Sequence, residues 1–512
     1  MSETRTPPRA ERLGEAGGTG VPTGATGGTG GSGVAEAPSI ARRDLTVIGV
    51  LLVAAFVVVL NETVMSVALP VLQTEMGVAP SVGQWLTTAF LLTMGVVIPL
   101  TGYLIQRLGT RPLFVLAMSL FTAGTVLATF APGFGVLLTA RVVQASGTAI
   151  MLPLLMTTVM TLVPPARRGV MMGNISVVIA VAPALGPTLS GVVIEHLGWR
   201  WVFGLVVPVA VAALLVGLRF VRSISTTSRA AIDLLSVPLA VLGFGGLVYG
   251  LVGLGHAAEG AGGHVPVAVP FVVGGAALAA FVARQLFLAR DDRALLDLRV
   301  FASSQFTIAM AAMLVAMAAM LGTFILVPYY AQAVLGLSPT ATGLLTLPGG
   351  ILMGVAGPIV GRVYDARGPR VLLVPGALLI SAALWLLTTL DADTSVAVLL
   401  AAYVVLCLGL AVTFTPLMTS GLGSVRPDLY AHGSAVLGTF QQVAGAAGTA
   451  LFVTVMTVVA AGATEDGASE RVAVADGVST AFLVGACLSL VLVAVVTLVR
   501  KPADAPEGVV GH

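Results

Sequence analysis

Charge is scarce in this chain. Only 9% of its 512 residues are Asp, Glu, Lys or Arg, whereas soluble domains contain about 25%. Hydrophobic residues make up 57%, and the mean hydropathy is +1.03. About 20 apolar residues in a helix cross a bilayer, and uncharged runs of this length recur almost to the C-terminus. The composition excludes a soluble globular protein and predicts an all-α polytopic membrane protein.

Other absences narrow the function. The two cysteines, Cys407 and Cys487, both fall in apolar runs, so a disulfide framework is not expected. No nucleotide-binding motif is found, which disfavours an ATP-driven pump. The apolar runs also contain no metal-ligand spacing and no pairing of a nucleophile with a base, which disfavours a membrane enzyme. We therefore expect no cofactor and no metal, and a transporter, a channel and a receptor stay open.

The apolar runs predict about fourteen membrane spans, and an even number places both termini on one side of the membrane. The predicted spans are Thr46–Leu69, Gln84–Leu104, Leu113–Phe130, Val136–Thr161, Val170–Ile194, Val202–Leu218, Leu234–Leu254, Val265–Phe287, Phe306–Pro328, Gly343–Val363, Val371–Leu390, Val396–Met418, Ala435–Val459 and Val478–Val499.

The basic residues predict the orientation. If the N-terminus is cytoplasmic, only Arg200 and Arg471 of the 25 basic residues face outward, and Arg141 falls within a span. Lysine and arginine favour cytoplasmic loops, so we expect both termini in the cytoplasm. Arginine outnumbers lysine by 24 to 1, which is typical of a GC-rich bacterial gene and indicates the inner (plasma) membrane.

Five parts are expected along the chain. The first is Gly/Thr-rich and has no apolar h-region, so it reads as a disordered tail and not as a signal peptide. The parts are a cytoplasmic tail (1–43), a six-helix bundle (44–230), two additional central helices with a cytoplasmic linker (231–299), a second six-helix bundle (300–500) and a C-terminal cytoplasmic tail (501–512).

Two loops are similar in sequence. GYLIQRLGTR (102–111) follows the second predicted span, and GRVYDARGPR (361–370) follows the tenth. A generic arginine-rich loop is one interpretation, but the matched spacing favours a transporter built from two repeats that rock around a central site. Both copies have glycine in the first and eighth places and arginine in the tenth; the residues singled out are Gly102, Arg107, Gly109, Arg111, Gly361, Asp365, Gly368 and Arg370.

These loops resemble the signature of the major facilitator superfamily, although Gln106 replaces the usual aspartate in the first copy. LNETVMSVALP (60–70) resembles the first-helix motif of its fourteen-span drug:proton antiporters, many of which have aspartate in place of Asn61. LLTARVVQASGTA (137–149) resembles their fourth-helix motif, and residues 432–451 resemble their thirteenth helix. The resemblance implies a major facilitator fold and proton-driven export of lipophilic compounds by alternating access.

PALGPTLSG (183–191) resembles the fifth-helix antiporter motif, with Ser190 in place of one glycine. Its small side chains let a neighbouring helix approach closely, and Pro187 removes a backbone donor and permits a bend. The resemblance implies that this helix, through Pro183, Gly186, Pro187 and Gly191, controls leakage between the two halves. Ordinary packing of small residues is the alternative.

Glu62 is the only one of 23 acidic residues well inside a predicted span. A charged acid at a helix centre costs about 2.5 to 3.5 kcal/mol, which favours protonation near neutral pH. We therefore expect Glu62 to bind the coupling proton; a static ion pair with Arg141 and direct recognition of a cation are the alternatives. Arg141 lies near the end of its span and could extend to the outer surface, while the resemblance implies a role in proton transfer.

Polar and aromatic residues in or beside the spans are candidates for a mostly apolar substrate cavity. They suit lipophilic compounds, cations included, and the alternative function is export of one endogenous metabolite such as a self-made antibiotic. The expected partners are such a substrate, protons and the bilayer, without nucleic acid, and we expect a monomer. The cavity candidates are Asn61, Gln84, Trp85, Gln144, Gln332, Gln441 and Gln442.

Overall fold

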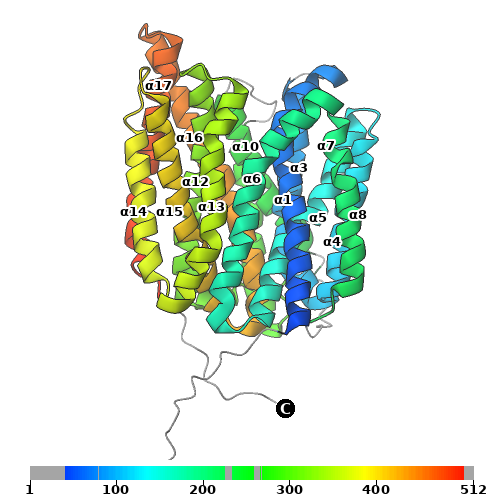
Figure 1. The fold of residues 1–512 in the computed structure, drawn as a ribbon. Coiled ribbons are helices and arrows are strands. Elements are labelled where there is room, and N and C mark those ends of the chain that lie inside the picture. The colour runs from blue at the N-terminus through cyan, green and yellow to red at the C-terminus, as the bar shows by residue number, and fades with distance from the viewer. Residues whose placement is uncertain are drawn as a thin grey trace, which may run out of the picture. The chain divides into compact units, whose positions relative to one another are not determined.

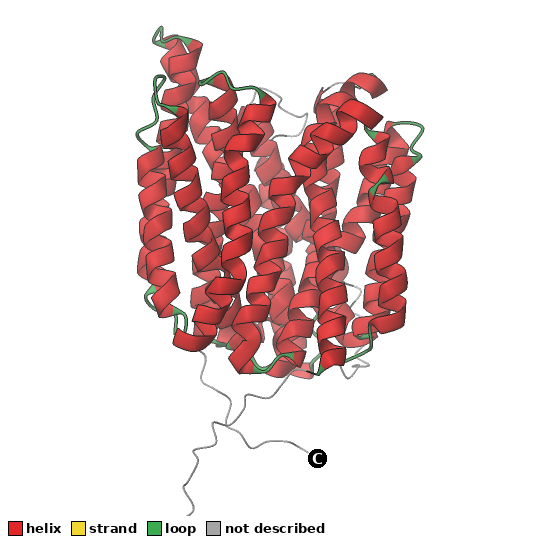
Figure 2. Ribbon diagram, viewed as in Figure 1, coloured by secondary structure: helices red, strands yellow, loops and turns green. Residues whose placement is uncertain are grey.

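The computed structural model describes residues 41–78, 80–224, 233, 235–258, 266 and 268–500, and this part of the chain contains helices and no strand (Figure 2). Most of the two predicted tails, residues 1–40 and 501–512, lies outside the described residues. The first group of helices is α1 (Arg42–Met76), α2 (Pro80–Gly83), α3 (Trp85–Leu108), α4 (Thr110–Thr129), α5 (Phe134–Leu162), η1 (Pro165–Arg167), α6 (Arg168–Leu197), α7 (Arg200–Gly204) and α8 (Val206–Phe220).

The remaining helices form a central group and a C-terminal group. The central group is α9 (Ser236–Ala240), the π-helical turn η2 (Val241–Gly245), α10 (Gly246–Ala258), α11 (Ala268–Leu288), η3 (Ala289–Asp291) and η4 (Leu298–Ala302). The C-terminal group is α12 (Ser304–Ala333), α13 (Pro339–Arg367), α14 (Arg370–Leu387), α15 (Val396–Gly423), η5 (Pro427–Leu429), α16 (Tyr430–Glu465) and α17 (Glu470–Val496).

Within the described residues, twelve helices are long and apolar enough to cross a membrane. Among the described residues every predicted span overlaps helix over most of its length, and the two that are not among these twelve are α6, of 30 residues, and the helical run 236–258. Several helices extend past the apolar windows; α1, for example, continues to Met76. Hydropathy reports the thickness of the hydrocarbon layer, whereas the helical hydrogen bonds continue beyond it. The chain is a multi-pass membrane protein.

The helices pack as two groups with the central helices beside them. In the first group α1 packs on α5, α6 and α8, and in the last group α12 packs on α15, α16 and α17. The groups meet where α6 packs on α13 and α3 packs on α16. Figure 1 shows α6 and α13 side by side near the start of α6 and diverging toward its end. Of the central helices, α10 packs on both α3 and α16.

The two similar loops have the same backbone geometry. Gly109 has φ +77° and ψ 171°, and Gly368 has φ +79° and ψ −178°. Side chains other than that of glycine rarely tolerate this region, which explains the glycine in the eighth place of both loops. The tenth residues also match, because Arg111 donates to the Leu218 carbonyl (2.9 Å) and Arg370 donates to the Val499 carbonyl (3.3 Å).

Both arginines therefore bind a carbonyl at or just past the end of the last helix of their own group. The loops lie at one end of the helical assembly, which we call the arginine-rich end. It carries Arg107, Arg111, Arg167, Arg168, Arg362, Arg367, Arg370 and Arg426.

Candidate functional site

Asn61 and Glu62 lie inside α1, about 30 Å along the helix from its start at 1.5 Å per residue. Asn61 is 1% exposed, and neither its Oδ1 nor its Nδ2 atom has a hydrogen-bond partner among the described residues. Glu62 is half-buried. Polar groups buried without partners are rare because they lose hydration without replacement. The adjacent Asn61 and Glu62 of the apolar run in α1 therefore form an unusual polar site.

Arg141 on α5 is also buried, with 1% of its surface exposed. Its Nη1 atom donates to Oε1 of Gln144 at 2.7 Å, and its Nε atom is 3.5 Å from the Leu86 carbonyl. The guanidinium carbon lies 4.1 Å from the centre of the Phe90 ring, a cation–π contact. The expectation that Arg141 could extend to the outer surface is wrong, because these contacts hold it inside the helical group.

Gln144 supports this arginine and does not line the cavity described below. Its Nε2 atom donates to Oγ1 of Thr125 on α4 at 2.9 Å, and its Oε1 atom faces Arg141. Both ends of the amide are therefore engaged in fixing the guanidinium, which corrects the assignment of Gln144 to the substrate cavity.

Glu62 and Arg141 interact through their charges without direct contact. Each is the charged group that acts on the other, yet no ion pair within 4.0 Å joins them among the described residues. Glu62 and Arg141 therefore do not form a bonded ion pair in this conformation. The carboxylate lies within the field of a buried cation that is already held by neutral groups.

The PALGPTLSG segment (183–191) of α6 packs on α1 directly beside Glu62. A Cβ atom at Gly186 would lie 2.1 Å from Oγ1 of Thr63, so the predicted close approach at Gly186 is confirmed. The Ser190 hydroxyl donates to the Val64 carbonyl at 3.1 Å. At Gly191, however, a Cβ atom would meet nothing within 4 Å, so close packing there is wrong for this structure. The side chains of Pro183 and Pro187 lie outside the described part.

Near the arginine-rich end, α6 and α13 touch through their backbones. A Cβ atom at Gly173 would be 2.3 Å from the carbonyl oxygen of Gly357, and one at Gly361 would be 2.2 Å from that of Gly169. These distances are shorter than any real Cβ contact, so glycine is required in the present packing. We call these four glycines the glycine seam.

Each similar loop contacts the start of a helix in the opposite group. Oδ1 of Asp365 accepts the amide of Gly169 (2.7 Å) and Oδ2 accepts that of Val170 (3.0 Å), so the carboxylate caps α6. A negative group is favourable at a helix N-terminus. In the first loop, a Cβ atom at Gly102 would be 2.9 Å from Nδ1 of His432 on α16. There Gln106 donates one hydrogen bond, to the Asp428 carbonyl at 3.1 Å.

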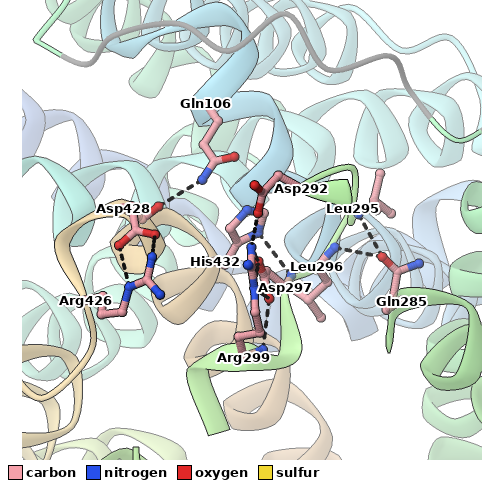
Figure 3. Close-up of polar contacts among 10 residues, drawn as sticks. All are labelled: Gln106, Gln285, Asp292, Leu295, Leu296, Asp297, Arg299, Arg426, Asp428 and His432. Atoms are coloured by element: carbon pink, nitrogen blue, oxygen red, sulfur yellow. Dashed lines mark hydrogen bonds and ion pairs between the residues drawn. The ribbon is translucent and has the colours of Figure 1, made fainter. Parts of the chain in front are cut away.

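The linker that follows the central helices joins this second contact, as Figure 3 shows. The amide of Asp297 donates to Nδ1 of buried His432 at 3.3 Å, and Arg299 binds both Asp297 and Asp292. Burial opposes ionisation of Asp297, but the hydrogen bonds from Arg299 outweigh it and hold the pKa of Asp297 below its usual value. Gln285 of α11 accepts the amides of Leu295 and Leu296 through Oε1.

Sequence reasoning missed this polar cluster and the ion pair between Asp233 and Arg284, which are 2.6 Å apart. The hydrogen bonds from Arg284 hold the pKa of Asp233 well below its usual value. One signal was available: residues 290–299, RDDRALLDLR, alternate acids and bases within a chain that has very few of either.

A cavity of about 360 Å³ lies between the two groups, lined by α1, α3 with its N-cap residue, α10, α12 and α16. Gln84 and Gln442, both predicted from sequence, line it together with Thr88 and Leu251. Trp85 is next to Gln84 but 42% exposed, and its ring stacks near Tyr249 of α10 with centroids 6.0 Å apart.

Three other cavity candidates are not among the residues that line this space. Asn61 is buried in α1, and Gln441 lies one position from a lining residue. Gln332 is exposed in the last turn of α12 and is not among the residues that line this cavity, so its assignment to a substrate cavity stays a prediction. A sequence window identifies polar residues within a span but not the side of the helix on which they lie.

Comparison with known proteins places this architecture. The family described as Major Facilitator Superfamily matches residues 51–449. The chain belongs to the major facilitator superfamily. The membership makes it a transporter and not an enzyme. The human organic anion transporter MFSD10 (TETRAN) has a similar fold, with a TM-score of 0.65 at 17% identity over 88% of this chain and 99% of that one.

Relatives in the superfamily are similar over most of their length. The lincomycin resistance protein LmrB of Listeria monocytogenes is 39% identical over 415 residues, which cover 81% of this chain and 87% of the relative. The transporter YcnB of Bacillus subtilis is 38% identical over 90% of this chain and 96% of its own length. The multidrug resistance protein B homolog of Mycobacterium tuberculosis is 31% identical over 80% of this chain and 75% of its own length.

Proposed function

We propose that this transporter is a fourteen-span antiporter that exports lipophilic drugs or toxic compounds across a bacterial plasma membrane in exchange for protons. The observation that carries the proposal is the half-buried carboxylate of Glu62 within the field of buried Arg141, with no ion pair to Glu62 among the described residues. The names of the bacterial relatives, which refer to lincomycin and multidrug resistance, support drug export.

The fourteen spans are the twelve long apolar helices together with α6 and the helical run 236–258. With the arginine-rich end in the cytoplasm, as the positive-inside rule favours, both termini are cytoplasmic. The glycine seam and both similar loops then close the cytoplasmic side. In this conformation the transporter is therefore closed to the cytoplasm. Rocking of the two groups would open that side and close the other.

In this cycle a proton from outside neutralises Glu62. Removing the negative charge weakens its attraction to Arg141 and changes the packing of α1 against α6 at Gly186. Substrate is released outward in the protonated state, and loss of the proton to the cytoplasm restores the charged form. Burial of an acid favours the neutral form, whereas a nearby cation favours the charged form, so opening and closing can move the balance between the two.

The test is transport of ethidium into inside-out vesicles under an imposed pH gradient. We expect Glu62→Gln to lower gradient-driven uptake by about tenfold or more, because the neutral amide cannot release a proton. It should retain exchange of labelled for unlabelled ethidium without a gradient, which shows that the variant folds and binds. Glu195→Gln, an exposed acid near the end of α6, is the control and should behave as wild type.

Equal gradient-driven uptake by Glu62→Gln and wild type would place the proton site elsewhere. If neither transports ethidium nor any other lipophilic drug tried, export of one endogenous metabolite becomes the better description. Broad drug resistance on expression in a sensitive host would exclude that alternative.

A further inference from the structure

The cavity between the groups is walled partly by a central helix. Val248 and Leu251 of α10 line it, opposite residues of α1, α12 and α16. The helix fits closely against α3, because a Cβ atom at Gly95 would be 3.2 Å from Cγ2 of Val248. The neighbouring Tyr249 ring packs near Trp85. The first central helix, although it lies beside the two groups, therefore forms one wall of the cavity between them.

No ionisable side chain is among the described residues that line this cavity, most of which are Leu, Ile, Val, Ala and Thr. A cation placed there would lose hydration without gaining a counter-charge, and burying an unpaired charge is costly. The walls therefore favour an uncharged ligand. The volume of about 360 Å³ lies within the range typical of small-molecule sites.

The polar groups of the cavity add a second requirement. Gln84 and Gln442 supply amides, and Thr88 and Thr449 supply hydroxyls. The Nε2 atom of Gln442 is buried and has no hydrogen-bond partner among the described residues. An amide nitrogen can only donate, so the group that would satisfy it is an acceptor such as a carbonyl or ether oxygen. Leaving a buried donor unpaired costs free energy, which a ligand oxygen would recover if the Gln442 side chain turns its Nε2 atom toward the cavity.

We propose that this cavity binds uncharged amphipathic molecules that present an acceptor oxygen to Gln442, and that α10 of the central insert determines which molecules fit. The inference rests on the proposed export function and narrows its substrate class. It also assigns a role to the central helices, whose side chain at Leu251 forms one wall of the site.

The experiment measures equilibrium binding of Nile red, an uncharged dye with a carbonyl oxygen, to the purified full-length protein in lipid nanodiscs. Gln442→Leu removes the donor with little change in volume, and we expect the dissociation constant to rise by about three- to tenfold. Gln441→Leu is the matched control one position away and should leave binding unchanged. Ethidium, a permanent cation, should still bind, as the transport test requires, but with an affinity about tenfold lower than that of an unlabelled uncharged analogue.

A second pair of variants tests the wall. Leu251→Trp should fill the cavity and abolish saturable Nile red binding, whereas Val272→Trp, at a 70% exposed position on α11, should not affect it. Absence of saturable binding to wild type, equal loss in Gln441→Leu, or unchanged binding in Leu251→Trp would each overturn the proposal. Because the assay needs no pH gradient, its result is independent of whether Glu62 couples protons.

Discussion

The two similar loops differ in one place that matters. Both contact the start of a helix in the opposite group, and both use the same glycine geometry in the eighth place and an arginine–carbonyl bond in the tenth. In the fifth place, however, Asp365 caps α6 with two hydrogen bonds, whereas Gln106 makes one neutral bond to the Asp428 carbonyl. One contact is closed by a charge and the other is not.

The uncharged contact has an additional segment beside it. The linker after α11 reaches the first turn of α16 through Asp297 and His432, and Arg299 fixes Asp297 (Figure 3). At the start of α6 the linker makes no hydrogen bond among the described residues; there Arg168 donates to the Tyr430 hydroxyl of α16 at 3.2 Å. The comparison teaches that a duplicated loop keeps the residues that set its backbone geometry, while the residue that closes the contact can change when another segment lies beside it.

Asp365→Asn should have the largest effect on this comparison. A hydrogen bond to a charged group contributes about 1.5 to 3 kcal/mol, so the arginine-rich end should open more often and the transport rate should fall by about tenfold or more. A reporter variant, Thr157→Cys, buried against Ser434 of the other group, should react faster with an impermeant maleimide applied to that end. The reporter requires a background in which Cys407 and Cys487 are replaced.

Asp428→Asn is the matched control at the contact of the other loop, where the Asp428 carbonyl accepts from Gln106. Asp428 is exposed and pairs with Arg426, so transport and reporter labelling should match those of the unmodified protein. Equal labelling in Asp365→Asn and Asp428→Asn would show that the cap on α6 does not hold this end closed.

His432→Leu should have an intermediate effect. It removes the acceptor for the Asp297 amide and leaves that donor unpaired, so transport should fall by about three- to fivefold. His432→Asn, whose carbonyl oxygen can accept the same hydrogen bond, should recover part of the loss. If both variants transport as well as wild type, the bond from the linker has no part in closing the first contact.

Gln106→Asp should have the smallest effect, a change in transport of less than about twofold, because it replaces one weak bond on an exposed surface. It sharpens the comparison when combined with Asp365→Asn. The double variant should be as slow as Asp365→Asn alone, since the loops act on different helices. Recovery of transport in the double variant would mean that the two loops are interchangeable.

The positions of the helices could be predicted from sequence because a membrane requires long apolar runs, and those runs are visible without any long-range information. Glu62 stood out for the same reason, as an acid where acids are costly. The surroundings of Arg141 could not be predicted, because a long side chain near the end of a span can point either way and only packing against Phe90 and Gln144 decides.

Long-range polar contacts were the other gap. The bond between Asp297 and His432 joins residues 135 positions apart, and the pair of Asp233 and Arg284 joins residues 51 apart. Hydrophobic periodicity describes one helix at a time, so it cannot predict which distant side chain forms a hydrogen bond or ion pair with a given residue. Gln332 is a related case, because the sequence predicts that it lies in a helix but not that its side chain is exposed.

If the two groups rock as proposed, the glycine seam sets a mechanical limit on that motion. Where α6 and α13 touch, main-chain atoms meet main-chain atoms, so the distance of closest approach is fixed by atomic radii and not by the choice of rotamer. The closest approach of α6 and α13 is therefore the same whichever substrate has been transported. Any adaptation to cargoes of different shape has to occur in the part of the stroke where these helices are apart.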